Sequence, residues 1–239
     1  ELTNAEQLVV WGSGLVGALA FSFTDSFWFS AVEGEVYALS SFFTAAVFWA
    51  ILKWETVADE QNANRWLVLI AYLVGLSTGV HLLNLLAIPA IGLVYYFKKY
   101  EFSWKGVIAA MAVSVAILAG IQYIIIPGIA RAAFVFDKTF VNGFGLPFNS
   151  GILFMVLAII AGIVWGIRFT QKRNLAIWNL AITMVAVILI GYSSFALIII
   201  RANANPPMNQ NHPDNAFALL RYLNREQYGD RPLLYGPYY

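Results

Sequence analysis

The chain has 239 residues, of which 60% are hydrophobic and 11% are charged, and its formal net charge is +1. A soluble domain carries about 25% charged residues, so this composition excludes an ordinary soluble globular domain and indicates a protein embedded in a lipid bilayer. The sequence contains no cysteine, which excludes disulfides and thiolate chemistry. The charge gives no reason to expect a nucleic-acid partner.

Seven apolar segments are long enough, or nearly so, to cross a bilayer, which takes about 20 residues. We therefore predict an all-α fold, a polytopic membrane helix bundle over residues 1–201, followed by a tail over residues 202–239. The predicted spans are 7–23, 36–53, 66–80, 82–97, 106–127, 151–168 and 175–200.

The third and fourth spans form one apolar stretch that is too long for a single crossing. Gly75, Gly79 and Pro89 interrupt it, and we predict two helices that turn near residues 79–81. One long kinked helix is the alternative, because membrane helices tolerate Gly and Pro.

Lysine and arginine in short loops set the orientation of a membrane protein. With a turn near residues 79–81, three cations fall on one side, namely Arg131, Lys138 and Arg201, and eight fall on the other. The eight-cation side is predicted to be cytoplasmic. The segment 24–35, a Gly- and aromatic-rich loop over 127–150, and the tail then face the outside, so the tail of a bacterial inner-membrane protein would be periplasmic. The eight cations are Lys53, Arg65, Lys98, Lys99, Lys105, Arg168, Lys172 and Arg173.

The stretch from Thr24 to Tyr37 holds three carboxylates, Asp25, Glu33 and Glu35, between two apolar runs. Carboxylates at a membrane boundary are costly unless they are solvated, paired or functional. They can act as a general base, hold a divalent cation or bind sugar hydroxyls. Capping of helix ends is the structural alternative for Asp25 and Glu33. If the second helix starts early, Glu33 and Tyr37 share one of its faces.

His81 is the one histidine in the apolar region, and Asn84 follows three residues later. We predict that both project from one face of the fourth helix near the external side, where both can donate hydrogen bonds to phosphate. A buried histidine bonded to a neighbour is the structural alternative. Arg131, in the predicted external loop, is a candidate cation for a lipid-linked phosphate, whereas Arg201 fits a snorkelling anchor. With two histidines and no cysteine, a zinc site is not expected.

The tail opens with a polar stretch rich in Pro and Asn. Asp214 is predicted to cap a short helix that runs through Leu223, and apolar Phe217, Leu220 and Leu223 recur at helical spacing, so this helix should rest on a surface. The residues from 231 to 236 are typical of a first strand. No nucleotide-binding or hydrolase motif is present.

Four stretches carry a resemblance to a known family. They are Phe27-Trp28 with Ala31-Val-Glu-Gly-Glu-Val-Tyr37, Gly75-Leu-Ser-Thr-Gly-Val-His-Leu-Leu-Asn-Leu-Leu86, Phe140-Val-Asn-Gly-Phe-Gly-Leu-Pro-Phe-Asn-Ser-Gly151, and Tyr222-Leu-Asn-Arg-Glu-Gln-Tyr-Gly-Asp-Arg-Pro-Leu-Leu-Tyr-Gly236. Together they resemble the bacterial membrane family known as domain of unknown function 2723, which is related to protein O-mannosyltransferases.

The resemblance implies a GT-C type glycosyltransferase that moves a sugar from a polyprenyl-phosphate carrier to a protein or glycan acceptor, often a Ser or Thr hydroxyl, with a carboxylate as base. The patterns around Tyr37 and His81 are similar to positions that face the external cavity of such enzymes, and Asn142 in the third stretch is a further candidate for substrate binding. The resemblance also implies no certain cofactor, although a divalent cation fits the carboxylates.

Family members carry an earlier helix pair with an acidic residue in the first external loop, and this sequence starts at what resembles the following helix. The chain is therefore expected to be a fragment, or else Asp25, Glu33 or Glu35 must serve as the base. Two other functions stay open from the residues alone. Broken helices suit a transporter-like subunit, and a chain without the usual base suits a non-catalytic scaffold.

Overall fold

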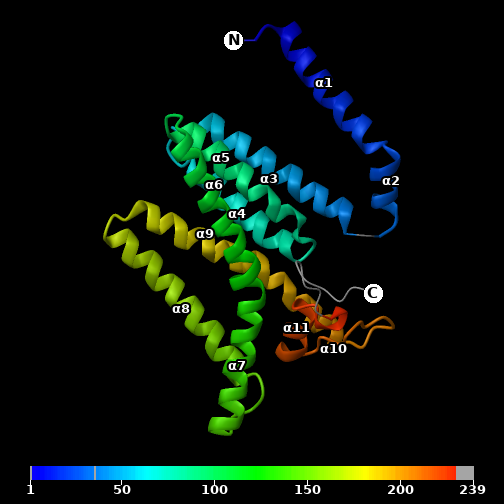
Figure 1. The fold of residues 1–239 in the computed structure, drawn as a ribbon, viewed down its shortest axis with the longest axis vertical. Coiled ribbons are helices and arrows are strands. Elements are labelled where there is room, and N and C mark those ends of the chain that lie inside the picture. Colours follow the sequence, from blue (N-terminus) through cyan, green and yellow to red (C-terminus); the bar gives the residue numbers. More distant parts are fainter. Residues whose placement is uncertain (1, 35, 230–239) are drawn as a thin grey trace, which may run out of the picture.

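The computed structural model describes residues 2–34 and 36–229, and within these ranges every regular element is helical (Figure 1). This confirms the predicted all-α class. The principal helices are α1 (Asn4–Ser22), α2 (Asp25–Val32), α3 (Tyr37–Val57), α4 (Asn64–Thr78), α5 (Ile88–Lys99), α6 (Trp104–Ala119), α7 (Ile126–Phe144), α8 (Ser150–Lys172), α9 (Ala176–Tyr192), α10 (Ala196–Asn203) and α11 (Ala216–Leu223). Short helical segments join them, namely η1 (Leu82–Ala87), η2 (Gly120–Ile125), η3 (Ser193–Phe195) and η4 (Glu226–Tyr228).

Five continuous helices of the described residues are long and apolar enough to cross a membrane, and the pair α1 and α2, bent by 64°, adds a sixth if it counts as one span. The predicted spans thus map onto helices, except that α4 has only 15 residues and is short for a crossing by itself. The protein is a multi-pass helical membrane bundle.

The predicted turn between the third and fourth spans is confirmed. Helix α4 ends at Thr78 and η1 begins at Leu82. A side chain at Gly79 would collide with the Ser194 hydroxyl, so glycine permits the close approach at this break. Pro89 lies in the first turn of α5, where its missing N–H leaves no helical hydrogen bond unmade.

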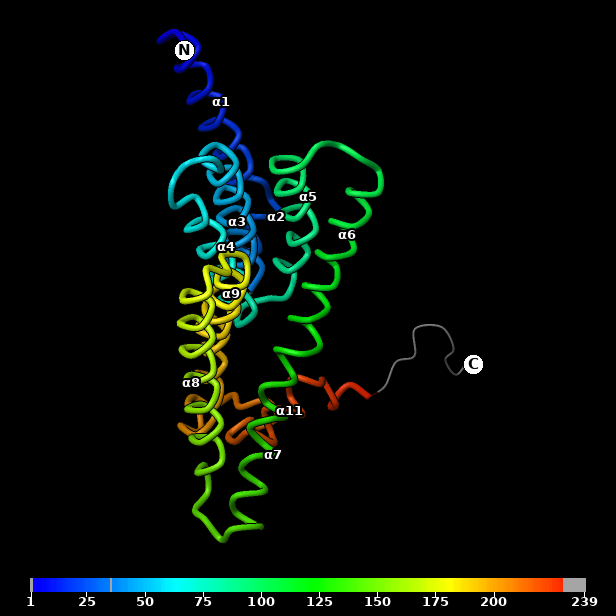
Figure 2. The backbone as a smooth tube through the Cα atoms, turned by 90° about the vertical axis from the view of Figure 1, so that its left-hand side faces the viewer, coloured from blue at the N-terminus to red at the C-terminus, as the bar shows by residue number. Residues whose placement is uncertain are grey.

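The prediction that residues 127–150 form a loop is wrong, whereas their external placement stays a prediction. Helices α6 and α7 form one continuous helix, Trp104–Phe144, of 41 residues, which runs from beside α5 down to the end of the molecule opposite α1 (Figure 2). The π-helical turns of η2 end two residues before Pro127, and π-turns and prolines are both common where a long helix bends. The Tyr192 hydroxyl also donates to the Ile126 carbonyl at 2.7 Å. Only residues 145–149 remain as the loop to α8.

The core lies where α4 crosses α9. A side chain at Gly75 would overlap the backbone of Ile188, and one at Gly191 would overlap the backbone of Gly75 and Leu76. The two glycines therefore allow backbone-to-backbone packing, as small residues commonly do between membrane helices. Helix α3 covers this crossing with Val47, Ile51 and Trp54, each at most 1% exposed.

At the end of the bundle that carries most cations, Lys99 Nζ donates to Ala58 O and Asp59 Oδ1, both at 2.8 Å. Lys98 lies 3.7 Å from the other carboxylate oxygen of Asp59. These contacts join the end of α5 to the end of α3. The Lys99 hydrogen bond and charge lower the pKa of Asp59 below its ordinary value, with a smaller contribution from Lys98.

In the tail, α11 packs on α7 through Leu219, Leu220 and Ala130. Asp214 does not cap this helix, because Asn215 accepts from the Phe217 and Ala218 amides, each at 3.0 Å. Asn215 has the extended backbone that a capping residue needs. The strand predicted for residues 231–236 lies outside the described residues.

Candidate functional site

Two predicted site residues from distant parts of the sequence meet at one end of the bundle. Tyr37 opens α3, and His81 lies in the break between α4 and η1. Their rings are tilted against each other, with centroids 5.4 Å apart. Tyr37 is 51% exposed and His81 is half-buried, so this aromatic pair is accessible from outside the bundle.

The hydrogen bond to His81 determines which of its ring nitrogens carries the proton. His81 Nδ1 accepts from the Leu83 amide at 3.1 Å, which makes His81 the N-cap of η1. In a neutral imidazole one nitrogen accepts and the other donates. The proton therefore lies on Nε2, which has no partner in the part of the chain that the structure describes and can donate to a ligand oxygen.

Asn84 does not project beside His81 as predicted. It is 0% exposed, and its Nδ2 donates to Ser77 Oγ at 2.9 Å. His81 has an extended backbone and precedes η1, so helical spacing does not relate the two side chains. Ser77 in turn donates to Val74 O at 2.8 Å. This hydrogen bond joins η1, whose N-cap is His81, to the end of α4.

Ser77 is a contributor that the sequence analysis missed. It lies within the Gly75-to-Leu86 stretch and is fully buried, and a serine two residues before a glycine break is a signal that could have pointed to it. Asn84 Oδ1 and Ser40 Oγ are also buried and have no hydrogen-bond partner among the residues the structure describes.

The carboxylates of the acidic stretch lie around the short helix α2. Asp25 is its first residue and Glu33 its C-cap, and neither side chain caps a helix within the described residues. Glu33 and Tyr37 do not share a helix face, because the chain turns at Gly34, with φ of +70°, before α3 begins. Asp25 and Glu33 are both exposed. Glu35 lies outside the described residues.

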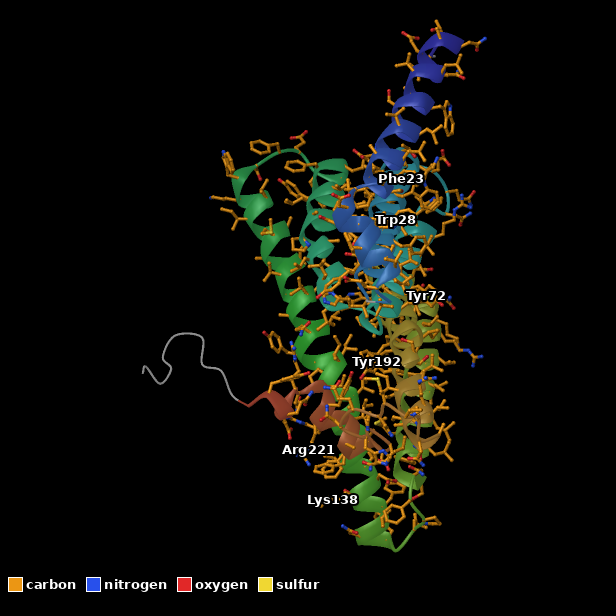
Figure 3. All side chains as sticks on the ribbon, turned by 90° about the vertical axis from the view of Figure 1, so that its right-hand side faces the viewer. Phe23, Trp28, Tyr72, Lys138, Tyr192 and Arg221 are labelled. Carbon is orange, nitrogen blue, oxygen red and sulfur yellow. The ribbon has the colours of Figure 1, made fainter. Side chains whose placement is uncertain are left out.

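Arg131 and Asn142 lie on α7 and not in a loop, because the helix continues through Pro127 to Phe144. Both are exposed, and no described contact joins either of them to Tyr37 or His81. Asn142 and Lys138 line a shallow space of about 470 Å³ on the surface of α7. Figure 3 shows Lys138 near the far end of α7, well separated from Phe23 and Trp28, whose rings stack at the α1–α2 bend with centroids 5.8 Å apart. Among the described residues of the predicted site, the structure thus shows contact only between Tyr37 and His81.

The described residues hold no group of three or more His, Asp or Glu side chains that could bind a metal ion. Because Glu35 lies outside the described residues, the divalent cation at these carboxylates stays a prediction.

Residues 1–104 match the family model of the protein O-mannosyl-transferase TMEM260 N-terminal domain. This part of the chain is thus similar to that domain. No curated protein and no solved structure matches the chain. The match runs from α1 to the start of α6 and contains six of the eight predicted site residues, all except Arg131 and Asn142. The bacterial family suggested by the sequence stays a prediction.

Proposed function

We propose that this protein acts in a membrane glycosyltransferase of the O-mannosyltransferase type. It would take a sugar from a polyprenyl-phosphate donor and pass it to an acceptor hydroxyl, such as a protein Ser or Thr, at the periplasmic face of a bacterial inner membrane. The observation that carries the proposal is that the Tyr37–His81 contact falls within the 104 residues that are similar to the TMEM260 N-terminal domain.

His81 has the chemistry to hold the donor's phosphate. Its Nδ1 accepts from the Leu83 amide, so Nε2 carries the proton, and Nε2 has no hydrogen-bond partner among the described residues. A fixed N–H donor that points at an anionic oxygen makes a strong hydrogen bond. The exposed ring of Tyr37 offers an apolar face for the sugar or the first part of the lipid. Asn84 would act indirectly, by holding η1 and His81 in place through Ser77.

In this proposal a carboxylate takes the proton of the acceptor hydroxyl as its oxygen attacks the anomeric carbon. The bond from that carbon to the phosphate oxygen breaks, and the electron pair leaves with the lipid phosphate. Glu35 precedes Tyr37 by two residues in the sequence, and Asp25 and Glu33 belong to the same stretch. Each is a candidate for this base on the sequence.

The test compares the two histidines of the chain. The protein, expressed from its complete gene and reconstituted in proteoliposomes, is supplied with radiolabelled polyprenyl-phosphate mannose and a Ser/Thr-rich acceptor peptide. We expect His81→Gln to lower transfer about tenfold or more, since it removes one hydrogen bond to a charged group. His212→Gln, in the tail, should leave transfer unchanged.

Equal transfer by the wild type and His81→Gln would remove His81 from the site. No transfer by the wild type, together with solute flux across the same vesicles, would favour a transporter in place of the enzyme. Glu35→Gln tests the carboxylate separately, and unchanged transfer by a folded variant would rule out Glu35 as the base.

A further inference from the structure

A small cavity lies in the tail, away from the Tyr37–His81 contact and outside the residues similar to the TMEM260 domain. Its volume is about 190 Å³, it is open to the surface, and it is lined by the end of α10, the loop over 206–213 and Tyr222 of α11. Arg201, Asn209, Gln210 and Tyr222 are among its lining residues. This volume is below the range of about 300–1,000 Å³ that drug-sized ligands occupy, so the cavity fits a small polar group.

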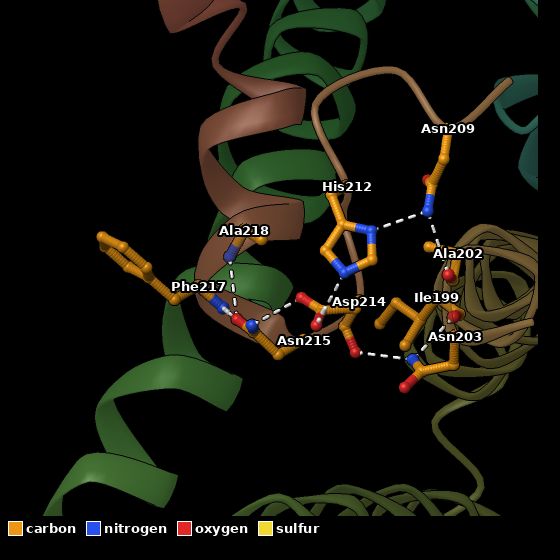
Figure 4. Close-up of polar contacts among 9 residues, drawn as sticks. All are labelled: Ile199, Ala202, Asn203, Asn209, His212, Asp214, Asn215, Phe217 and Ala218. Carbon is orange, nitrogen blue, oxygen red and sulfur yellow. Dashed lines mark hydrogen bonds and ion pairs between the residues drawn. The ribbon is translucent and has the colours of Figure 1, made fainter. Parts of the chain in front are cut away.

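The loop that forms one wall is held in place by side-chain hydrogen bonds (Figure 4). Asn209 Nδ2 donates to Ala202 O at 3.0 Å and contacts His212 Nδ1 at 2.6 Å. His212 Nε2 lies 3.3 Å from Asp214 Oδ2, and Asn203 Nδ2 donates to Asp214 O at 2.8 Å. The cavity wall is therefore organised before any ligand arrives.

The polar groups at the cavity have complementary hydrogen-bonding roles. Both amide protons of Asn209 are used by Ala202 and His212, so its Oδ1 remains as an acceptor. Arg201 forms no ion pair with any residue in the described ranges, and its guanidinium can only donate. A ligand that satisfies both groups needs an anionic oxygen for Arg201 and a hydroxyl donor for Asn209.

The cavity also lies at a membrane boundary. Helix α10 completes the apolar helix Ala176–Asn203, which is long enough to cross a bilayer, and the polar loop follows directly. Arginine at such a position reaches the level of the lipid headgroups. Guanidinium groups bind phosphate well because their planar donors match its oxygens.

We propose that this cavity binds a phosphate ester that carries a free hydroxyl group, with Arg201 on the phosphate and Asn209 Oδ1 on the hydroxyl. A phospholipid headgroup such as phosphatidylglycerol and a soluble glycerol phosphate share this chemistry. The proposal does not depend on the proposed glycosyltransferase activity.

Two probes distinguish these sources. Native mass spectrometry of the protein released from nanodiscs of mixed phosphatidylglycerol and phosphatidylcholine measures which lipid is retained. Calorimetric titration of sn-glycerol 3-phosphate into protein in phosphatidylcholine nanodiscs measures the soluble ligand. Retention of phosphatidylglycerol alone identifies a membrane headgroup, and binding of both probes shows that the headgroup without its acyl chains is sufficient.

Arg201→Gln should weaken binding of whichever probe binds by about tenfold or more. Arg221→Gln is the matched control, because Arg221 is an exposed tail arginine that is already paired with Glu226 at 3.1 Å, and it should bind as the wild type does. Asn209→Ala frees the loop from Ala202 and His212 and should also weaken binding while Arg201 is intact. This second variant keeps the test valid if Arg201→Gln does not fold.

Methyl phosphate, which lacks the hydroxyl, should bind at least severalfold more weakly than glycerol 3-phosphate where the latter binds. Equal retention of phosphatidylglycerol by the wild type and Arg201→Gln, with no binding of glycerol 3-phosphate, would show that Arg201 is only a membrane anchor. That result would overturn the proposal.

Discussion

Two parts of this molecule carry glycines in apolar helices, and they use them differently. At the crossing of α4 and α9, side chains at Gly75 or Gly191 would overlap the backbone of the other helix. In α1, by contrast, side chains at Gly12, Gly14 or Gly17 would meet nothing within 4 Å. No residue of α1 is buried, and the helix stands apart from the bundle (Figure 1).

An apolar sequence with small residues therefore predicts a membrane helix, but it does not predict which other helix that helix packs against. Helix α1 is defined locally, by a capping box in which Thr3 and Glu6 satisfy each other's free groups. The α4–α9 pair is defined by contact between distant parts of the sequence, such as Gly75 and Ile188, which are 113 residues apart. Substitutions at the two places should therefore have unequal effects on stability.

Gly191→Ala should have the largest effect on stability. The added methyl group overlaps the backbone of Gly75 and Leu76, which no rotamer change relieves, so α4 and α9 must separate. We expect a loss of about 3 kcal/mol, or roughly 6–12 °C in the unfolding temperature in detergent.

Gly14→Ala is the matched control in α1, and it should leave the unfolding temperature unchanged or raise it, because alanine favours helix by up to about 1 kcal/mol. Equal destabilisation by both substitutions would show that α1 is as closely packed as the crossing, and would break the comparison.

Tyr192→Phe should have an intermediate effect. It removes the hydroxyl that donates to Ile126 O at 2.7 Å in the buried region beside the π-helical turns, which leaves that carbonyl without this partner. A buried hydrogen bond of this kind contributes about 1 kcal/mol, or roughly 2–4 °C. Tyr123→Phe, at a residue that is 75% exposed, serves as the control. An unchanged unfolding temperature in Tyr192→Phe would mean that the Ile126 carbonyl finds another donor.

Asp59→Asn should have the smallest effect, no more than about 2 °C, because exposed ion pairs contribute little. The folded-state pKa of Asp59 is lowered by Lys99, so its contribution is present above its ordinary pKa and is lost as the pH falls through the lower folded value. The difference from the wild type should therefore shrink between neutral pH and pH values below 3.8. Glu60→Gln is the control, and a difference that grows in acid would contradict the assignment.

Much of the fold could be predicted from the sequence, because apolar length indicates a membrane helix and a break at Gly79 fits the alternation of charges. The continuation of α7 through Pro127 could not, since a proline after a long apolar run also fits a loop, and only the structure shows the π-helical turns before it and the bond from Tyr192 to Ile126 O across 66 residues. Likewise, Asp214 and Asn215 are both good capping residues, and only the backbone conformation selects Asn215.

The candidate site was predicted in part. Tyr37 and His81 were each selected from sequence, but their contact depends on how α3 packs beside the break after α4. The inward direction of Asn84 was missed because His81 has an extended backbone, which ends helical periodicity at that residue. Arg131 and Asn142 were placed with them only because the loop over 127–150 was expected.

The most direct test of the proposed site is to map where a lipid-phosphate sugar binds. A photoreactive polyprenyl-phosphate mannose is crosslinked to the protein in proteoliposomes, and the labelled peptides are identified by mass spectrometry. The Tyr37–His81 site predicts labelling within residues 25–37 and 81–86, reduced in His81→Gln. Labelling confined to the opposite end of the bundle, around Asp59 and Lys99, would contradict it.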